Sequence, residues 1–165
     1  MPVGTIDEAM HLIENWMQDR GLAIPSEQED EESKRELNFK YDGKTDIGLG
    51  FAIIQPKRAK RVVIMVSRVD IAKPHKAALG SMKVRKFEDF MWEIKKELVF
   101  APTTFQILPP EGIPESIQFS REISFDELTE GKLADTLGSI MKSTVLIILL
   151  FGKKFGLGIT GGKKA

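Results

Sequence analysis

The chain has 165 residues, no cysteine and two histidines, and its 24 Lys and Arg balance 24 Asp and Glu to a formal net charge of zero. The length suits one domain with a core of its own. Without cysteine the chain forms no disulfide, holds no Cys-ligated metal and performs no thiol chemistry. Zero net charge argues against a globally basic nucleic-acid binder. The composition therefore predicts no metal site and no cofactor.

The sequence carries no recognisable targeting or membrane-spanning segment. Acidic residues interrupt the apolar residues of the N-terminal segment, which is unlike a signal peptide. The longest apolar run, residues 145–151, has seven residues, whereas a membrane span needs about 20. We expect a cytoplasmic protein that does not contact membranes. Abundant Lys and Glu without cysteine also favour a thermophilic source.

Residues 6–20 are predicted to form an amphipathic helix. Thr5 and Glu8 have the spacing of a capping box, and Gly21 stands where a helix-ending glycine belongs. Apolar residues recur at helical spacing behind the cap. The acidic stretch that follows, residues 25–36, predicts a solvated loop. A second interpretation of that stretch is a docking surface for a basic partner.

Three strands are predicted next, at 37–41, 47–54 and 61–69, because apolar and polar residues alternate there. The connections between them are too short for parallel crossovers, so the strands should form an antiparallel meander. In the third strand both faces carry apolar side chains, which is typical of a central strand covered on more than one face.

The second half of the chain is predicted to form two helices, two strands and a last helix. Pro74 begins a short helix that ends at Leu79, and a longer helix spans 83–99. Its predicted core stripe is Val84, Phe87, Met91, Ile94 and Leu98, with Phe90 beside it. Strands follow at 103–108 and 115–123. The spacing of Ser124 and Glu127 predicts a second capping box, which begins a helix that runs from 125 to about 150.

These elements predict a single α+β domain over residues 1–151, followed by a basic, glycine-rich tail over 152–165. The order is α-β-β-β-α-β-β-α, with a five-stranded antiparallel sheet packed by helices. The tail holds five of the fourteen glycines and no acidic residue.

Three short stretches accompany this order of elements: Ile13-Glu14-Asn15-Trp16-Met17, Ile53-Ile54-Gln55-Pro56-Lys57 and Arg68-Val69-Asp70. With them, residues 5–150 resemble an uncharacterised archaeal member of the group with the type III secretion chaperone fold, which includes the YbjN-like proteins. The resemblance implies a sheet covered by helices, often in a homodimer that binds client proteins through apolar patches. It brings no catalytic residues. The chain departs from the secretion chaperones because it is neutral where they are acidic.

Residues 145–151 are apolar on every side of the predicted helix, whereas a surface helix keeps a polar face. The segment is therefore buried within the chain or meets a partner, and both interpretations stay open. A third places Phe151, Phe155 and the neighbouring lysines on a membrane surface. As a surface for a client protein or a second copy, the segment would use Leu146, Ile147, Leu150 and Phe151.

Basic residues gather at the turn between the second and third predicted strands and in the tail. As a phosphate-binding surface for nucleic acid they would bind in a salt-dependent way, and as ordinary surface residues they need no ligand. Aromatic residues that would stack on bases do not alternate with them. The residues concerned are Lys57, Arg58, Lys60, Arg61, Lys153, Lys154, Lys163 and Lys164.

The sequence shows no catalytic constellation. His11 and His75 have no nearby arrangement of Ser or carboxylate residues that forms a triad. The glycines from Gly156 to Gly161 match the letters of a dinucleotide motif, but the helix and the acidic residue that this motif needs do not follow.

The function predicted from the sequence is a non-enzymatic, chaperone-like protein-interaction module that forms a homodimer. A nucleic-acid- or ribosome-associated protein that uses the basic surface and tail is one alternative. A small enzyme whose site is assembled from distant residues is the other.

Overall fold

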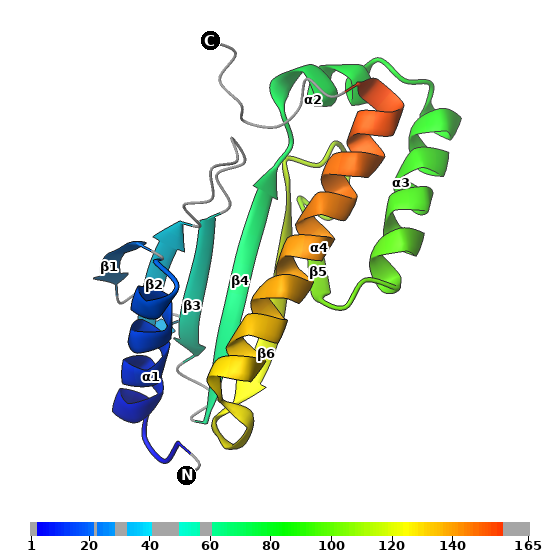
Figure 1. Ribbon diagram of the computed structural model, residues 1–165. Coiled ribbons are helices and arrows are strands. Elements are labelled where there is room, and N and C mark those ends of the chain that lie inside the picture. The colour runs from blue at the N-terminus through cyan, green and yellow to red at the C-terminus, as the bar shows by residue number, and fades with distance from the viewer. Residues whose placement is uncertain (1–2, 22, 29–32, 41–49, 57–60, 157–165) are drawn as a thin grey trace. The chain divides into compact units, whose positions relative to one another are not determined.

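The structure is a computed structural model that describes residues 3–21, 23–28, 33–40, 50–56 and 61–156, with the backbone alone for 23–28, 33–40 and 50–51. The predicted helices and strands are found in the expected order, with one additional strand and one additional 3₁₀ turn (Figure 1). Their bounds are α1 Ile6–Asp19, β1 Ala23–Gln28, β2 Ser33–Lys40, β3 Gly50–Pro56, β4 Val62–Asp70, α2 Lys73–Gly80, α3 Val84–Val99, β5 Thr104–Leu108, β6 Ser116–Ser124, η1 Phe125–Glu127 and α4 Glu130–Phe155.

The strands form one sheet in the order β1-β2-β3-β4-β6-β5. The first four pair antiparallel, so the predicted α+β class and the antiparallel meander are confirmed. Ile53 of β3 lies opposite Met65 of β4, and both are buried. The described residues form six strands, which corrects the prediction of five.

The strand that the sequence analysis missed is β1, which lies in the stretch predicted to be an acidic loop. β1 pairs with β2 at the edge of the sheet, and β2 itself begins at Ser33, four residues before the predicted strand. An edge strand is held by backbone hydrogen bonds on one side and tolerates charged side chains. The alternation of apolar residues therefore gave no signal for it.

The beginning of the last helix also differs from the prediction. Ser124 makes no capping hydrogen bond, and residues 125–127 form the 3₁₀ turn η1. The hydroxyl of Thr129 instead accepts a hydrogen bond from the backbone N–H of Lys132 at 3.0 Å, and α4 begins at Glu130. Phe125, the first residue of this turn, is buried.

The chain divides into two compact units. Unit 1 consists of Met1–Ser67 and Ser120–Gly138, and unit 2 of Arg68–Phe119 and Ser139–Ala165. In unit 1 the predicted capping box begins α1: Glu8 N donates to Thr5 Oγ1, and the Glu8 carboxylate accepts from Thr5 N. One face of α1 is buried, through Ala9, Met10, Ile13, Trp16 and Met17.

Unit 2 has an apolar core built from α2, α3, β5, β6 and the second half of α4 (Figure 1). α3 contributes one buried stripe to it, whereas Val84, which the sequence analysis placed in that stripe, is 73% exposed. The buried core residues are Ile71, Leu79, Phe90, Met91, Ile94, Leu98, Ile107, Ile117, Phe119, Ile147 and Phe151.

Candidate functional site

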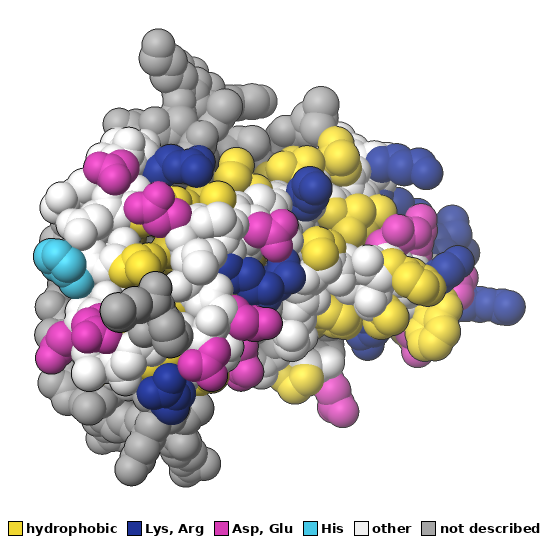
Figure 2. All heavy atoms as spheres, turned by 60° about the horizontal axis from the view of Figure 1, so that its bottom comes forward, with side chains coloured by type: hydrophobic (Ala, Val, Ile, Leu, Met, Phe, Trp, Pro, Cys, Tyr) yellow, Lys and Arg dark blue, Asp and Glu magenta, His cyan; other side chains and the backbone are white. Residues whose placement is uncertain are grey.

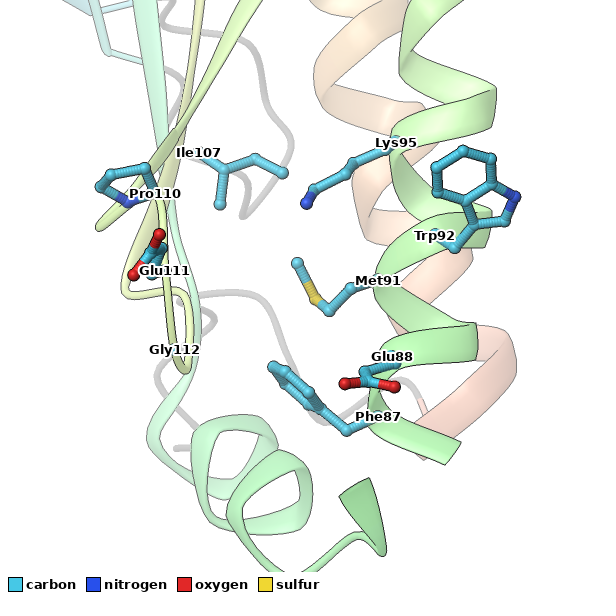
Figure 3. A pocket seen from close by; sticks show the side chains of 9 residues that line it. All are labelled: Phe87, Glu88, Met91, Trp92, Lys95, Ile107, Pro110, Glu111 and Gly112. Atoms are coloured by element: carbon cyan, nitrogen blue, oxygen red, sulfur yellow. The ribbon is translucent and has the colours of Figure 1, made fainter. Parts of the chain in front are cut away.

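A groove of about 330 Å³ lies in unit 2 between α3 and the loop that joins β5 to β6. Figure 3 shows the side chains of Phe87, Met91 and Ile107 pointing into it, and Lys95 reaching across from α3. Glu88 and Lys95 on α3 and Glu111 on the loop supply its charged groups. The groove therefore combines an apolar lining with charges of both signs.

The loop side of the groove is shaped by a tight turn. Glu115 N donates to Leu108 O at 2.8 Å, and this bond closes the turn between β5 and β6. Gly112 has φ +81°, a conformation that favours glycine. A Cβ on Gly80, at the end of α2, would lie 3.2 Å from Ile113 Cδ1, so this loop also packs closely against α2.

The helix side of the groove continues into an exposed surface that we call the α3 flank: Val84, Glu88, Trp92, Lys95 and Val99. At 3.6 residues per turn these five positions fall within roughly 80° of the helix circumference. Val84 and Trp92 are each 73% exposed and Val99 is 68% exposed. In Figure 3 the Trp92 side chain points away from the groove, on the outer side of α3.

Single exposed apolar residues are ordinary on protein surfaces, whereas several together mark a candidate binding site. α3 carries three on its flank, and Phe100, 82% exposed, follows at its end. Figure 2 shows hydrophobic side chains at the surface among Lys, Arg, Asp and Glu side chains. The sequence analysis overlooked the flank because it counted Val84 as core and gave Trp92 no role. The signal that could have revealed the flank is the presence of large apolar residues outside the core stripe of α3.

The four residues predicted to bind a partner in α4 lie in or against the core of unit 2. Ile147 and Phe151 are each 1% exposed, and Leu146 and Leu150 are partly buried against the same core. A partner cannot reach Ile147 or Phe151 while α4 is packed. In the same segment Val145 and Leu149 are 42% and 58% exposed. The burial of Ile147 and Phe151 thus agrees with the first of the three interpretations, burial within the chain.

The predicted phosphate-binding residues are only partly described. Lys57, Arg58, Lys60, Lys163 and Lys164 lie outside the described residues. Arg61 forms an ion pair with Asp126 at 3.1 Å, donates to the carbonyl of Gly4, and lies over the ring of Phe125. Lys153 and Lys154 are exposed in the last turn of α4, which extends to Phe155 and so takes in the first residues of the predicted tail. Lys154 Nζ lies 5.8 Å from the ring centre of Phe90.

α4 is long and apolar enough to cross a membrane by length and composition alone. The core helix of a soluble protein meets the same criterion, and α4 places Ile147 and Phe151 in the core of unit 2. Its buried hydroxyls are satisfied locally. Ser143 donates to Ser139 O, and Ser143 Oγ and Thr103 Oγ1 share a hydrogen bond of 2.7 Å.

His75 lies at the beginning of α2, packed within the aromatic part of the unit 2 core. Its ring stacks on Phe151 with centres 5.7 Å apart, and Phe155 lies at 5.3 Å. Burial lowers the pKa of His75 from its ordinary value of 6.5, and a hydrogen bond with the backbone of Gly156 opposes that shift. Nδ1 has no hydrogen-bond partner in the part of the chain that the structure describes. Burial thus favours the neutral form of the imidazole. Within the described residues no cluster of His, Asp and Glu could hold a metal ion.

The lowered pKa of His75 predicts a loss of stability on the acid side. The unfolded chain binds a proton below pH 6.5 while the folded chain does not, so the free energy of unfolding should fall as pH falls from 6.5 toward the lower folded pKa. The slope is at most about 1.4 kcal/mol per pH unit. Denaturant unfolding between about pH 5 and pH 8 measures it.

His75→Phe should remove this part of the pH dependence, because phenylalanine keeps an aromatic ring and takes no proton. His11→Gln, at the exposed histidine of α1, is the control and should keep the acid-side loss. Equal slopes for wild type and His75→Phe would show that another group causes the loss.

Comparison with known proteins identifies a family and a fold. A family model described as an uncharacterized conserved protein matches residues 9–151. A search of curated proteins found no match. The crystal structure of an uncharacterized protein from Methanothermobacter thermautotrophicus is similar at 20% identity with a TM-score of 0.80, covering 90% of this chain and 99% of that one. YbjN from E. coli is 10% identical with a TM-score of 0.45, covering 92% and 94% of the two chains. The first of these structures shares the fold of this chain.

Proposed function

Because the chain belongs to the family of uncharacterized conserved proteins DUF2299, we propose a function from its surface: it is a non-enzymatic, chaperone-like protein-interaction module. Its binding surface is the α3 flank together with the adjoining groove. The single observation that carries this proposal is the exposure of Trp92, 73% of which faces solvent beside the groove.

Trp92 has the properties of an anchor residue. Tryptophan combines a large apolar surface with one hydrogen-bond donor, and it is enriched among the residues that contribute most to protein–protein binding. Leaving it in water forgoes the burial free energy of the indole, about 25 cal/mol per Å² of apolar surface. A partner that covers Trp92 and Val99 recovers this free energy.

The charges of this surface favour a protein partner. Glu88, Lys95 and Glu111 bring both signs to the groove, whereas a phosphate-binding surface is basic throughout. Arg61, the described member of the basic turn, already has a carboxylate partner in Asp126. These observations support a mixed-charge protein surface as the ligand, ahead of a nucleic acid.

A comparison of captured proteins tests the proposal. We expect wild type to retain a defined protein from native lysate and Trp92→Ser to retain at most about a thirtieth as much at limiting concentration, as for the loss of about 2 kcal/mol at an anchor residue. Leu149→Ser is the matched control, because Leu149 is an exposed apolar residue of α4 outside the flank. Mass spectrometry of nuclease-treated and untreated halves reads the result.

Equal retention by wild type and Trp92→Ser would overturn the assignment of the α3 flank. Retention that nuclease abolishes would overturn the protein-binding function and favour the nucleic-acid alternative.

A further inference from the structure

The chain separates its charges along the sequence, although their sum is zero. No Asp or Glu occurs in residues 71–87 or in residues 136–165, and each of these stretches holds five basic residues. Together they carry ten of the 24 Lys and Arg residues. Zero net charge therefore argues against a chain that is basic throughout, but it is compatible with a surface that is basic locally.

The fold brings the two stretches together at one end of unit 2. α2 and the beginning of α3 come from the first stretch, the last turn of α4 comes from the second, and Figure 1 shows the three at the same end. The ring of Phe155 lies 5.3 Å from that of His75 and 5.3 Å from that of Phe90, measured between ring centres. We call the basic residues of these three segments the basic end: Lys73, Lys76, Lys83, Arg85, Lys86, Lys153 and Lys154.

The charges of the basic end are accessible and are not neutralised by neighbouring side chains. Six of its seven residues are exposed, and Lys76 is half-buried. None of the seven forms an ion pair with another described residue. Lys86 lies one helical turn before Phe90 on α3, and Lys154 Nζ of α4 lies 5.8 Å from the centre of the Phe90 ring. Two helices thus place positive charge around the same ring.

The beginnings of α2 and α3 add to the positive potential of the basic end. Neither helix has an acidic residue in its first turn or a side-chain cap. A helix N-terminus carries a partial positive charge, which Asp or Glu stabilises. Lys73, Lys83 and Arg85 stand at these positions instead, and α3 first becomes acidic at Glu88 and Asp89. These like charges repel one another in the unbound protein, and a bound polyanion would offset that repulsion.

We propose that the basic end binds the phosphate backbone of double-stranded nucleic acid and does not read its bases. This backbone is uniformly negative, which matches a surface built from two stretches without acidic residues. Single strands are bound through exposed aromatic side chains, and membranes through apolar side chains that enter the lipid. At the basic end Phe90 and Phe151 are buried and Phe155 is partly buried against them, which favours a duplex over both.

This inference goes beyond the proposed function, because the basic end shares no residue with the α3 flank. Charge removal with a matched control tests it. Lys73→Gln, Lys86→Gln and Lys153→Gln together form the basic-end variant, which loses one cation from each of α2, α3 and α4. Lys96→Gln, Lys132→Gln and Lys142→Gln together form the control variant, which loses three cations from α3 and α4 elsewhere and has the same net charge.

Fluorescence anisotropy measures the binding of the full chain to a labelled DNA duplex and to an RNA duplex of the same sequence. Wild type should bind both with similar affinity, with a Kd on the order of 10 µM at about 50 mM salt. With about four phosphate contacts, raising the salt to about 150 mM should weaken binding roughly fiftyfold. The basic-end variant should bind at least about tenfold more weakly than wild type at the lower salt concentration and show a shallower salt dependence. The control variant should bind within about threefold of wild type.

Circular dichroism checks that each variant is folded, and vesicles of phosphatidylserine and phosphatidylcholine test a membrane as the partner. Equal affinities of the two variants would overturn the assignment to the basic end. Vesicle binding by a wild type that binds neither duplex would overturn the choice of nucleic acid, and binding to only one duplex would overturn recognition through phosphates alone. Trp92→Ser should bind the duplexes as wild type does while it loses the captured protein, so this inference and the proposed function can fail separately.

Discussion

Phe151→Ala is expected to lower the free energy of unfolding by about 3–5 kcal/mol, the usual cost of removing a buried phenyl ring and leaving a cavity. Phe151 is 1% exposed and lies at the centre of the aromatic cluster of unit 2. Its ring packs edge-on against Phe90 at 5.5 Å, stacks on His75 and lies 6.1 Å from Phe155. Denaturant unfolding followed by circular dichroism measures the change.

The matched control for Phe151→Ala is Leu149→Ala, two residues earlier on the same helix. Leu149 is 58% exposed, so its truncation should change the free energy of unfolding by about 0.5 kcal/mol or less. Similar small effects at both positions would show that residues 145–151 face a partner instead of the core. The contrast between the two variants therefore decides between the interpretations that the sequence left open for this segment.

Trp16→Ala should lower the free energy of unfolding by a comparable amount, about 3–5 kcal/mol. Trp16 is 2% exposed on the buried face of α1, and the Arg20 guanidinium lies 5.6 Å from its ring centre. Removing the indole therefore opens a cavity beneath α1 and removes the partner of a cation–π contact. Thermal and denaturant unfolding of the variant give the magnitude.

Trp16→Phe separates the packing of this ring from its polar atom. The indole Nε1 is buried and has no hydrogen-bond partner among the described residues, and phenylalanine has no such group. The smaller ring loses some packing while the unsatisfied N–H disappears, so the net change should stay below about 1.5 kcal/mol. A loss of unfolding free energy for Trp16→Phe as large as that for Trp16→Ala would show that the indole N–H has a hydrogen-bond partner in the folded protein.

Helices α1 and α3 show how far the spacing of apolar residues along the sequence predicts which side chains are buried. In α1 the apolar residues repeat at helical spacing along one face, and the same residues are buried. In α3 the spacing was equally clear, yet Val84 is exposed, because a stripe extrapolated to the helix end need not have anything to cover it. Periodicity reports which side chains share a face. It does not report where the neighbouring element ends.

The candidate site lay beyond sequence reasoning for a related reason. Glu88 and Lys95 come from α3, whereas Pro110 and Glu111 come from a loop that follows β5. Their joint position depends on the turn closed between Glu115 and Leu108 and on the close approach of Gly80 to Ile113. No local sequence pattern encodes how close α3 and this loop lie in the folded chain.

The sequence by itself determined the α+β class, the cap and buried face of α1, the antiparallel meander and the approximate extent of α3, since each depends on spacing between neighbouring residues. Only the tertiary structure decided that β1 pairs at the edge of the sheet, that Phe151 is core and that Trp92 is surface. These outcomes depend on which elements meet across long separations in the chain. A side chain is buried by what packs against it, and its own identity sets only the free energy gained when that happens.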